Sequence, residues 1–156
     1  MHARHAACAA SLVAILCAAL PSRVLTAQGD SRPAFSDRDA TRLLGQIVAG
    51  LEAHNSRKML SAFDLRKMND GQLFRQDTES FFRQTGTIRA RYNILETSMD
   101  DGRGQADASM EIEADRLDET LPPIHKQAQL HLLFDNSAAG WRVVGLEPRS
   151  FFSTQP

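Results

Sequence analysis

The chain has 156 residues, of which 42% are hydrophobic and 24% are charged, and its formal net charge is −1 at pH 7. This length suits one domain that is large enough to bury a core. The ordinary composition excludes a disordered or collagen-like chain. The small net charge excludes a strongly basic surface for nucleic acid or for an anionic membrane.

Residues 1–27 have the pattern of a secretory signal peptide. The segment has no acidic residue, carries Arg4 near its start and contains an apolar run over residues 9–20 that ends at Pro21. This run is shorter than the roughly twenty residues that a membrane-spanning helix needs, which favours a cleaved signal over a membrane anchor. We therefore predict a protein that is exported to the periplasm or secreted, is not attached to a membrane, and begins near Gln28 after cleavage.

Both cysteines, Cys8 and Cys17, lie in this segment. The mature chain would then have neither a thiol nor a disulfide, although it would enter an oxidising compartment. Its stability is expected to come from packing alone. Residues 28–35 are predicted to be a flexible polar lead because they include Gly29 and Pro33.

Three helices are predicted before any strand. The first, capped by Ser36 or Asp37, carries apolar residues at helical spacing on one face. Further helices are expected over residues 56–63 and 70–86, and the last of them is expected to end at Gly86. The first helix is thus amphipathic and needs an apolar surface to cover.

From residue 87 onward, apolar and polar residues alternate, which is typical of strands with one dry and one wet face. The alternation is unbroken between Gln105 and Asp115. A Pro-Pro pair at 122–123 keeps its own segment out of a central strand. The pattern predicts four antiparallel strands, over residues 87–94, 105–115, 127–134 and 141–146.

A turn at Asp100-Asp101-Gly102 predicts a hairpin between the first two strands. A turn centred on Asp101 would bring opposite charges together, but a shift of two residues would also do so, so the charges leave the register open. The pairs expected for the centred turn are Arg91 with Glu111, Arg89 with Glu113, and Tyr92 with Met110.

The last strand is expected to place Trp141 and Val143 on the dry face. Strict alternation then puts Val144 and Leu146 on the wet face, beside Leu133 of the preceding strand. The whole pattern predicts an α+β domain over residues 36–152, in which three helices pack on a curved antiparallel sheet of about four strands, followed by a short tail at 153–156.

This order of elements, ending in Gly140-Trp141-Arg142-Val143-Val144, resembles the NTF2-like superfamily, the cone-shaped fold of SnoaL-like proteins and ketosteroid isomerase. The continuation through Leu146 to Phe152 is similar to exported, uncharacterised bacterial members. The resemblance implies a pocket between the helices and the dry face of the sheet. It also implies dimers that form through the wet face. It implies no single function, because the fold carries enzymes, binding modules and dimerisation modules.

A pocket of this kind would be lined mainly by apolar residues. Tyr92 is the only inward strand residue with a polar group, and small alanines on the middle strands can either leave room for a ligand or let phenylalanines pack closely. We expect no cofactor and a small apolar ligand. The predicted ligand-binding residues are Tyr92, Met110, Phe82 and Trp141.

An enzyme of the isomerase or lyase type is the alternative. It would need a carboxylate base and a hydrogen-bond donor, and Asp64 and Tyr92 are the candidates for those roles. An aspartate after a helix is more often a turn or capping residue, and a buried tyrosine is more often part of the core. The sequence therefore favours a binding module.

No metal site is predicted. His125 and His131 are six residues apart on one strand, so about 20 Å separates them at roughly 3.3 Å per residue.

The wet face suggests a different role, because apolar residues in its second half are rimmed by charges. We predict a homodimer through this face, with the interface residues His131, Leu133, Val144 and Leu146.

Overall fold

The computed structural model describes residues 34–153. The predicted signal peptide, its cleavage site, residues 28–33 of the predicted lead and residues 154–156 lie outside the described residues. No helix within the described range is both long and apolar enough to cross a membrane.

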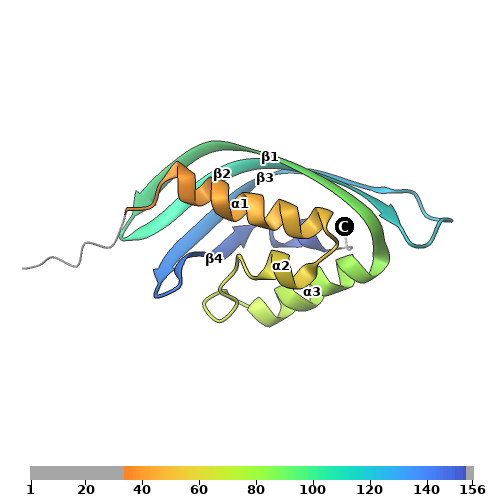
Figure 1. The fold of residues 1–156 in the computed structure, drawn as a ribbon, viewed down its shortest axis with the longest axis horizontal. Helices are drawn as coiled ribbons and strands as arrows, with labels where there is room; N and C mark the ends of the chain where they lie inside the picture. Colours follow the sequence, from red (N-terminus) through yellow and green to blue (C-terminus); the bar gives the residue numbers. More distant parts are fainter. Residues whose placement is uncertain (1–33, 154–156) are drawn as a thin grey trace, which may run out of the picture. The chain divides into compact units, whose positions relative to one another are not determined.

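The described chain is an α+β domain of three helices followed by a four-stranded sheet. All neighbouring strands are antiparallel, in the order β1-β2-β3-β4. Figure 1 shows the helices on the concave side of the curved sheet, as the sequence predicts. The elements are α1 (Asp37–Glu52), α2 (Ser56–Leu60), α3 (Gly71–Gln84), β1 (Thr85–Asp100), β2 (Arg103–Arg116), β3 (Ile124–Ser137), β4 (Gly140–Glu147) and the short 3-10 helix η1 (Arg149–Phe152).

Two helix ends differ from the predicted ones. Helix α2 is capped by Asn55, whose side chain accepts a hydrogen bond of 2.9 Å from the backbone N–H of Lys58, and it stops at Leu60. Helix α3 ends at Gln84 and passes directly into β1, so Gly86, the predicted helix stop, is a strand residue. The prediction for Gly86 was wrong because the chain continues into the ladder without a left-handed turn.

The register of the first hairpin is the one expected for a turn centred on Asp101. Arg91 lies opposite Glu111, and its guanidinium is 3.2 Å from the carboxylate of that residue. A register shift follows Ile94, so the outer part of β1 no longer follows a strict alternation. The other two predicted pairs, Arg89 with Glu113 and Tyr92 with Met110, are also present.

The core forms between α1 and the dry face of the sheet, and it includes a residue from the predicted flexible lead. Phe35 is only 9% exposed. Its ring stacks on Phe134 with 4.5 Å between centroids and meets the ring of Trp141 edge-on at 5.1 Å. The expectation that the lead is loose up to residue 35 was therefore wrong for its last residue.

A β-bulge in the pairing of β3 with β4 changes which residues face the core. Leu133 pairs with Gly145 and Phe134 pairs with Val143, so Val144 is the extra residue. After the bulge the alternation is shifted by one position. Leu146, predicted on the wet face, is instead 3% exposed and belongs to the core.

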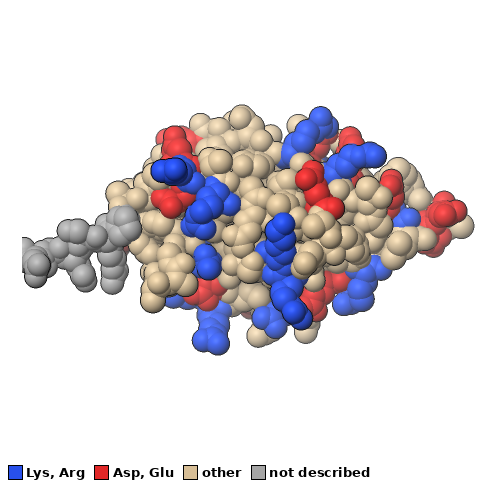
Figure 2. Space-filling view, viewed as in Figure 1, with Lys and Arg blue, Asp and Glu red and all other residues tan. Residues whose placement is uncertain are grey.

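The side of the domain that carries the helices has no surface of a single charge. Figure 2 shows basic and acidic side chains interspersed over this face. This agrees with the near-neutral net charge of the chain.

Candidate functional site

A cleft of about 690 Å3 opens beside Asp64. It is bounded by α2, by the segment that follows α2, by α3 and by the turn between β3 and β4. Asp64 is half-buried there. The predicted position of Asp64 near the mouth of a pocket thus corresponds to a real hollow, whose lining includes Arg57, Arg66, Arg75, Arg142 and Glu79.

The position of Asp64 is set by the edge of the sheet. Its backbone N–H donates to the carbonyl of Val143 at 2.8 Å, and the N–H of Val143 donates to the carbonyl of Ala62 at 3.0 Å. These bonds form a short parallel bridge between the segment after α2 and β4. The carboxylate of Asp64 accepts the backbone N–H of Arg66 at 3.2 Å, which is the turn-forming contact expected of an aspartate after a helix.

Tyr92 lies elsewhere. Its side chain is half-buried, and its hydroxyl donates a hydrogen bond of 3.1 Å to the backbone carbonyl of Thr41 in α1. Tyr92 is not part of the lining of the cleft beside Asp64. The structure therefore does not bring the predicted base and the predicted donor to a common hollow.

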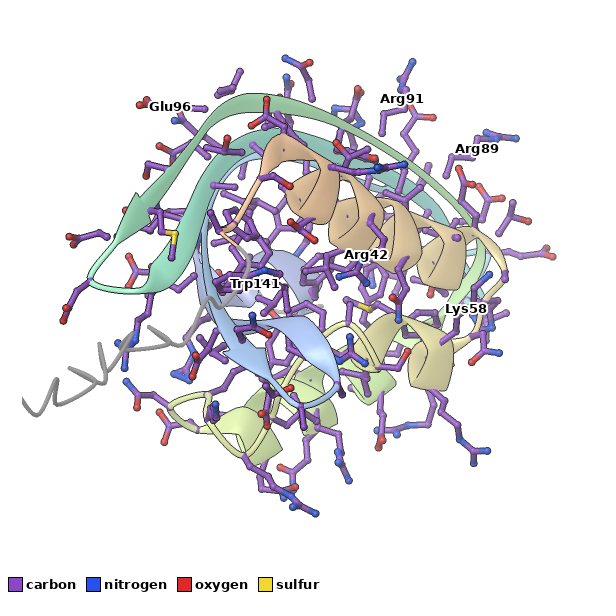
Figure 3. The ribbon with its side chains drawn as sticks, turned by 60° about the vertical axis from the view of Figure 1, so that its left-hand side comes forward. Arg42, Lys58, Arg89, Arg91, Glu96 and Trp141 are labelled. Carbon is purple, nitrogen blue, oxygen red and sulfur yellow. The ribbon has the colours of Figure 1, made fainter. Side chains whose placement is uncertain are left out.

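The other predicted ligand-binding residues are packed in the core. Met110, Phe82 and Trp141 are 0%, 5% and 4% exposed. Figure 3 shows Trp141 between the sheet and α1. The ring of Phe35 meets the ring of Trp141 edge-on at 5.1 Å. None of the three predicted residues lines the cleft beside Asp64 or the hollow beside Leu133. The rings of Phe35, Phe134 and Trp141 are in contact with one another in the core.

The predicted interface residues do come together. A hollow of about 630 Å3 is lined by His131, Leu133, Val144 and Leu146. His131 also contacts the carboxylate of Asp107, with 2.9 Å between its Nδ1 and an oxygen of that group. Leu146 is buried at 3% exposure although it lines this hollow, whereas Leu133 and Val144 are half-buried.

Two charged residues at this hollow affect each other. The ammonium group of Lys67 donates a hydrogen bond of 2.6 Å to Asp135. This bond is the main reason why the pKa of Asp135 lies below its ordinary value.

Elsewhere on β3, burial lowers the pKa of Lys126, and the nearby charge of Arg116 lowers it further.

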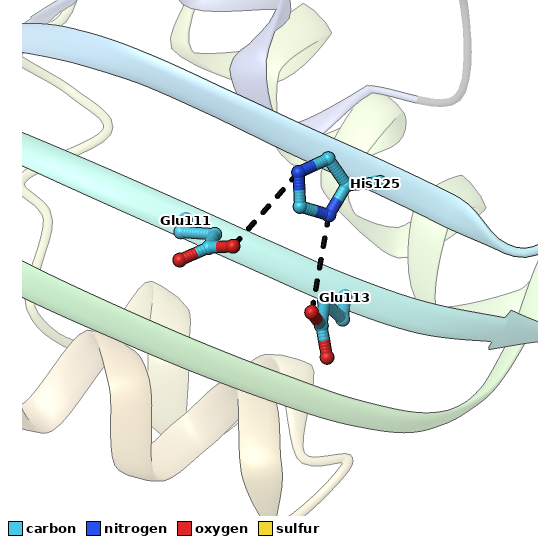
Figure 4. Close-up of side chains that lie close together, drawn as sticks. All are labelled: Glu111, Glu113 and His125. Carbon is cyan, nitrogen blue, oxygen red and sulfur yellow. Dashed lines mark ion pairs between the residues drawn. The ribbon is translucent and has the colours of Figure 1, made fainter.

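The outer face also holds a cluster that the sequence analysis missed. The pairing of β2 with β3 puts His125 opposite Glu113 and close to Glu111, with nitrogen-to-oxygen distances of 4.0 and 3.8 Å (Figure 4). Their ligand atoms lie within 4.8 Å of one another, a spacing that a metal ion could bridge. Arg91 lies 3.2 Å from Glu111 and 4.0 Å from Glu113, so both carboxylates already have a cation beside them.

The cluster could have been predicted only if the pairing of residues between β2 and β3 had been known. The first hairpin has a short turn that limits the possible registers, but residues 117–123 between β2 and β3 form a longer connection. Sequence alone therefore offered no register for His125. Figure 3 shows Arg89 and Arg91 projecting away from the sheet on its outer side, as the wet-face prediction requires.

No protein-family model matches the sequence, and no curated protein matches it. Solved structures do match its fold. A candidate scytalone dehydratase from Novosphingobium aromaticivorans is 9% identical with a TM-score of 0.61, and the match covers 70% of this chain and 79% of that one. An NTF2-like superfamily protein from Salmonella enterica is 10% identical with a TM-score of 0.59, over 70% of this chain and 86% of that one.

A third match is a candidate dehydratase of the NTF2-like family from Streptomyces avermitilis. It is 8% identical with a TM-score of 0.56, and the match covers 70% of this chain and 91% of that one. Identities this low show the fold and say nothing of function. The described part of the chain has the NTF2-like fold, as the resemblance in its sequence predicts.

Proposed function

We propose that this protein is a homodimeric, non-catalytic interaction module, in which the outer face of the sheet joins two copies. The observation that carries the proposal is the hollow on this face, which Leu133 and Val144 line together with His131. An apolar centre with a polar rim is the usual composition of an interface patch. A partner side chain can fill the hollow and exclude water from both leucine and valine.

The rim of the hollow favours a second copy as the partner. Arg103 and Glu147 both line it, and neither has a salt-bridge partner within 4.0 Å among the described residues. A two-fold interface sets one patch against an identical patch, so a patch that carries both signs can pair with itself. The arrangement therefore supports self-association more than binding of a strongly charged partner.

The filled core supports the non-catalytic part of the proposal. The interior, where ketosteroid-isomerase-like chemistry would need a base and a donor, holds Phe35, Phe134 and Trp141 in ring contact. A substrate would have to displace at least one of these rings. The apolar ligand predicted from the sequence would also have to displace one of these rings. We therefore propose its site only for a form of the protein in which Phe35 has moved.

The test is the molar mass of the purified protein in solution. We expect a concentration-dependent dimer in sedimentation equilibrium, and we expect Leu133→Asp to shift it to monomer because a buried, unpaired carboxylate would oppose contact. Leu73→Asp is the matched control, since Leu73 is 54% exposed on α3, away from the sheet. A wild type that stays monomeric at high concentration would contradict the proposal, as would equal effects of the two substitutions.

A second candidate function is an isomerase or lyase with Asp64 as its base. The observation that favours it is the cleft beside Asp64, together with two matched structures that are described as candidate dehydratases. In this case Tyr92 would not be the donor unless its bond to Thr41 is broken. Elimination of water from hydroxy-carbonyl compounds, measured for the wild type and Asp64→Asn, would distinguish this function from simple binding.

A further inference from the structure

The cleft beside Asp64 has an unusual charge. Its walls come from four separate parts of the domain. Four guanidinium groups and two carboxylates line it, which leaves a local net charge of +2 in a chain whose total net charge is −1. The arginines are Arg57, Arg66, Arg75 and Arg142, and the carboxylates belong to Asp64 and Glu79.

The cleft lies outside the filled core. Arg142 sits between Trp141 and Val143 on β4, and both of those side chains are buried. Because successive strand side chains point to opposite faces, Arg142 projects away from the core and into the cleft. A ligand bound here would not need to displace Phe35 or Trp141.

The walls are held in place by the fold. The segment that carries Asp64 and Arg66 is bonded to the edge of β4 through Val143, which fixes it beside Arg142. Arg75 and Glu79 are four residues apart on α3, and the buried residues Phe74 and Thr78 anchor this helix against the core. The cleft is therefore built on packed elements rather than on one loop.

The four arginines have N–H groups that are not paired with a carboxylate. Among residues 34–153, no carboxylate oxygen lies within 4.0 Å of a nitrogen of any of the four side chains. Arg142 donates one bond of 3.2 Å to the carbonyl of Trp141. By contrast, Arg91 and Arg149 each pair with a carboxylate. Guanidinium groups bind carboxylate and phosphate oxygens with paired hydrogen bonds, so unpaired arginines around one cleft are suited to an anion.

We propose that this cleft binds a small polyanion that presents carboxylate or phosphate oxygens to Arg75 and Arg142. The volume of the cleft, about 690 Å3, is that of a small-molecule site. The two carboxylates in the lining disfavour a bare monoanion and limit the ligand to one that can engage several guanidinium groups together. Asp64 lies beside the bound anion and weakens its binding by repulsion.

The experiment is titration calorimetry of the purified protein with three probes at low ionic strength: inorganic phosphate, pyrophosphate and citrate. We expect saturable binding of pyrophosphate or citrate at one site per chain, weakened by added salt. Comparison of citrate with pyrophosphate distinguishes a carboxylate ligand from a phosphate ligand. Arg75→Gln and Arg142→Gln should each weaken binding about tenfold, the loss expected for one charged hydrogen-bonding group.

Two further variants make the test specific. Arg83→Gln is the matched control, since Arg83 is exposed on the same helix as Arg75 but does not line the cleft. Asp64→Asn should strengthen binding, because it removes a negative charge from the lining. Thermal unfolding followed by circular dichroism checks that all variants fold.

Two results would overturn the proposal. The first is the absence of saturable binding for all three probes up to about 10 mM, a concentration at which even a weak site is occupied. The second is an equal loss of affinity in Arg83→Gln and Arg75→Gln, because the attraction would then belong to the whole surface and not to the cleft.

Discussion

The ring of Phe35 occupies the space that a side chain at position 104 would need. A Cβ built on Gly104 would overlap the ring atoms of Phe35. Glycine at position 104 is therefore required by the close approach of an aromatic ring and not by an unusual backbone angle. This contact joins Phe35, which lies two residues before α1, to the start of β2, and it closes the core around Phe134 and Trp141.

Substitution of Gly104 by alanine should destabilise the fold. The new methyl group would push Phe35 off its stacked position, and overpacking of this kind costs about 1–3 kcal/mol of unfolding free energy. Chemical denaturation measures the change. Gly86→Ala is the control, because a Cβ at Gly86 meets the Leu117 side chain at an ordinary 3.6 Å. Equal losses in the two variants would contradict the packing role of Gly104.

Removal of the Phe35 ring should open an apolar site in the core. We expect Phe35→Ala to lose about 3–5 kcal/mol of stability and to leave a cavity beside Trp141. An apolar cavity binds benzene. Trp141 is the only tryptophan in the chain, so its fluorescence should change saturably with benzene in Phe35→Ala. Phe35→Leu, which keeps most of the volume, should respond much less, and no response in either variant would argue against an apolar site.

Because of the bulge in β4, substitutions of Leu146 and Val144 should have different effects on stability. Leu146→Asp should unfold the protein, because it buries an unpaired carboxylate where Leu146 is 3% exposed. Val144→Asp should change the unfolding free energy by only about 1 kcal/mol, because Val144 is half-buried on the outer face. Thermal melts followed by circular dichroism distinguish the two. A Leu146→Asp variant that is folded and monomeric would contradict this prediction, because it would indicate that Leu146 lies on the outer face.

The Lys67–Asp135 pair should give a small stability that depends on pH. The hydrogen bond from Lys67 keeps the pKa of Asp135 below 3.8 in the folded state. Its stabilisation is therefore complete above the unfolded-state pKa and is lost as the pH falls through the lower, folded-state pKa. Both side chains are partly exposed, at 45% and 29%, so the contribution is at most about 1 kcal/mol.

Denaturation of Asp135→Asn at several pH values tests this pair. The variant should be less stable than the wild type at pH 7, and the difference should shrink as the pH is lowered below 3.8. Asp115→Asn is the control, since Asp115 is exposed and has no salt-bridge partner within 4.0 Å among the described residues. A difference for Asp135→Asn that persists unchanged in acid would exclude the proposed cause.

Export should be visible in the mass of the protein. From the pattern of residues 1–27, we expect the native host to release a chain that begins near Gln28 and contains no cysteine. Intact-mass measurement of protein isolated from the periplasm or the medium gives the cleavage site directly. Recovery of the full-length chain from the cytosol would contradict this expectation.

The local patterns of the sequence predicted most of the fold. Helical spacing identified α1, and the alternation of apolar and polar residues identified all four strands. The turn at Asp101 and Gly102 predicted the first hairpin, because a short turn lets only neighbouring strands pair, whereas the charges fitted two registers and the structure has the one centred on Asp101. These features depend on residues close in sequence.

Apart from the helix ends, the features that the sequence did not predict depend on how separate elements pack against each other. The bulge at Val144 arises from how β4 fits β3, and it moves Leu146 from the outer face to the core. The burial of Phe35 depends on the space above Gly104. Alternation within one strand cannot show either effect, since it assumes an unbroken ladder.

The sequence by itself determined the class of the domain, the order of its elements and the chemistry available to it, because periodicity and turn residues act locally. Only the tertiary structure decided that aromatic rings fill the core and that Asp64 and Tyr92 lie in different surroundings. It also decided that Arg57, Arg66, Arg75 and Arg142 share one cleft. These arginines come from α2, the segment after it, α3 and β4, and only the folding of the chain brings such distant positions together.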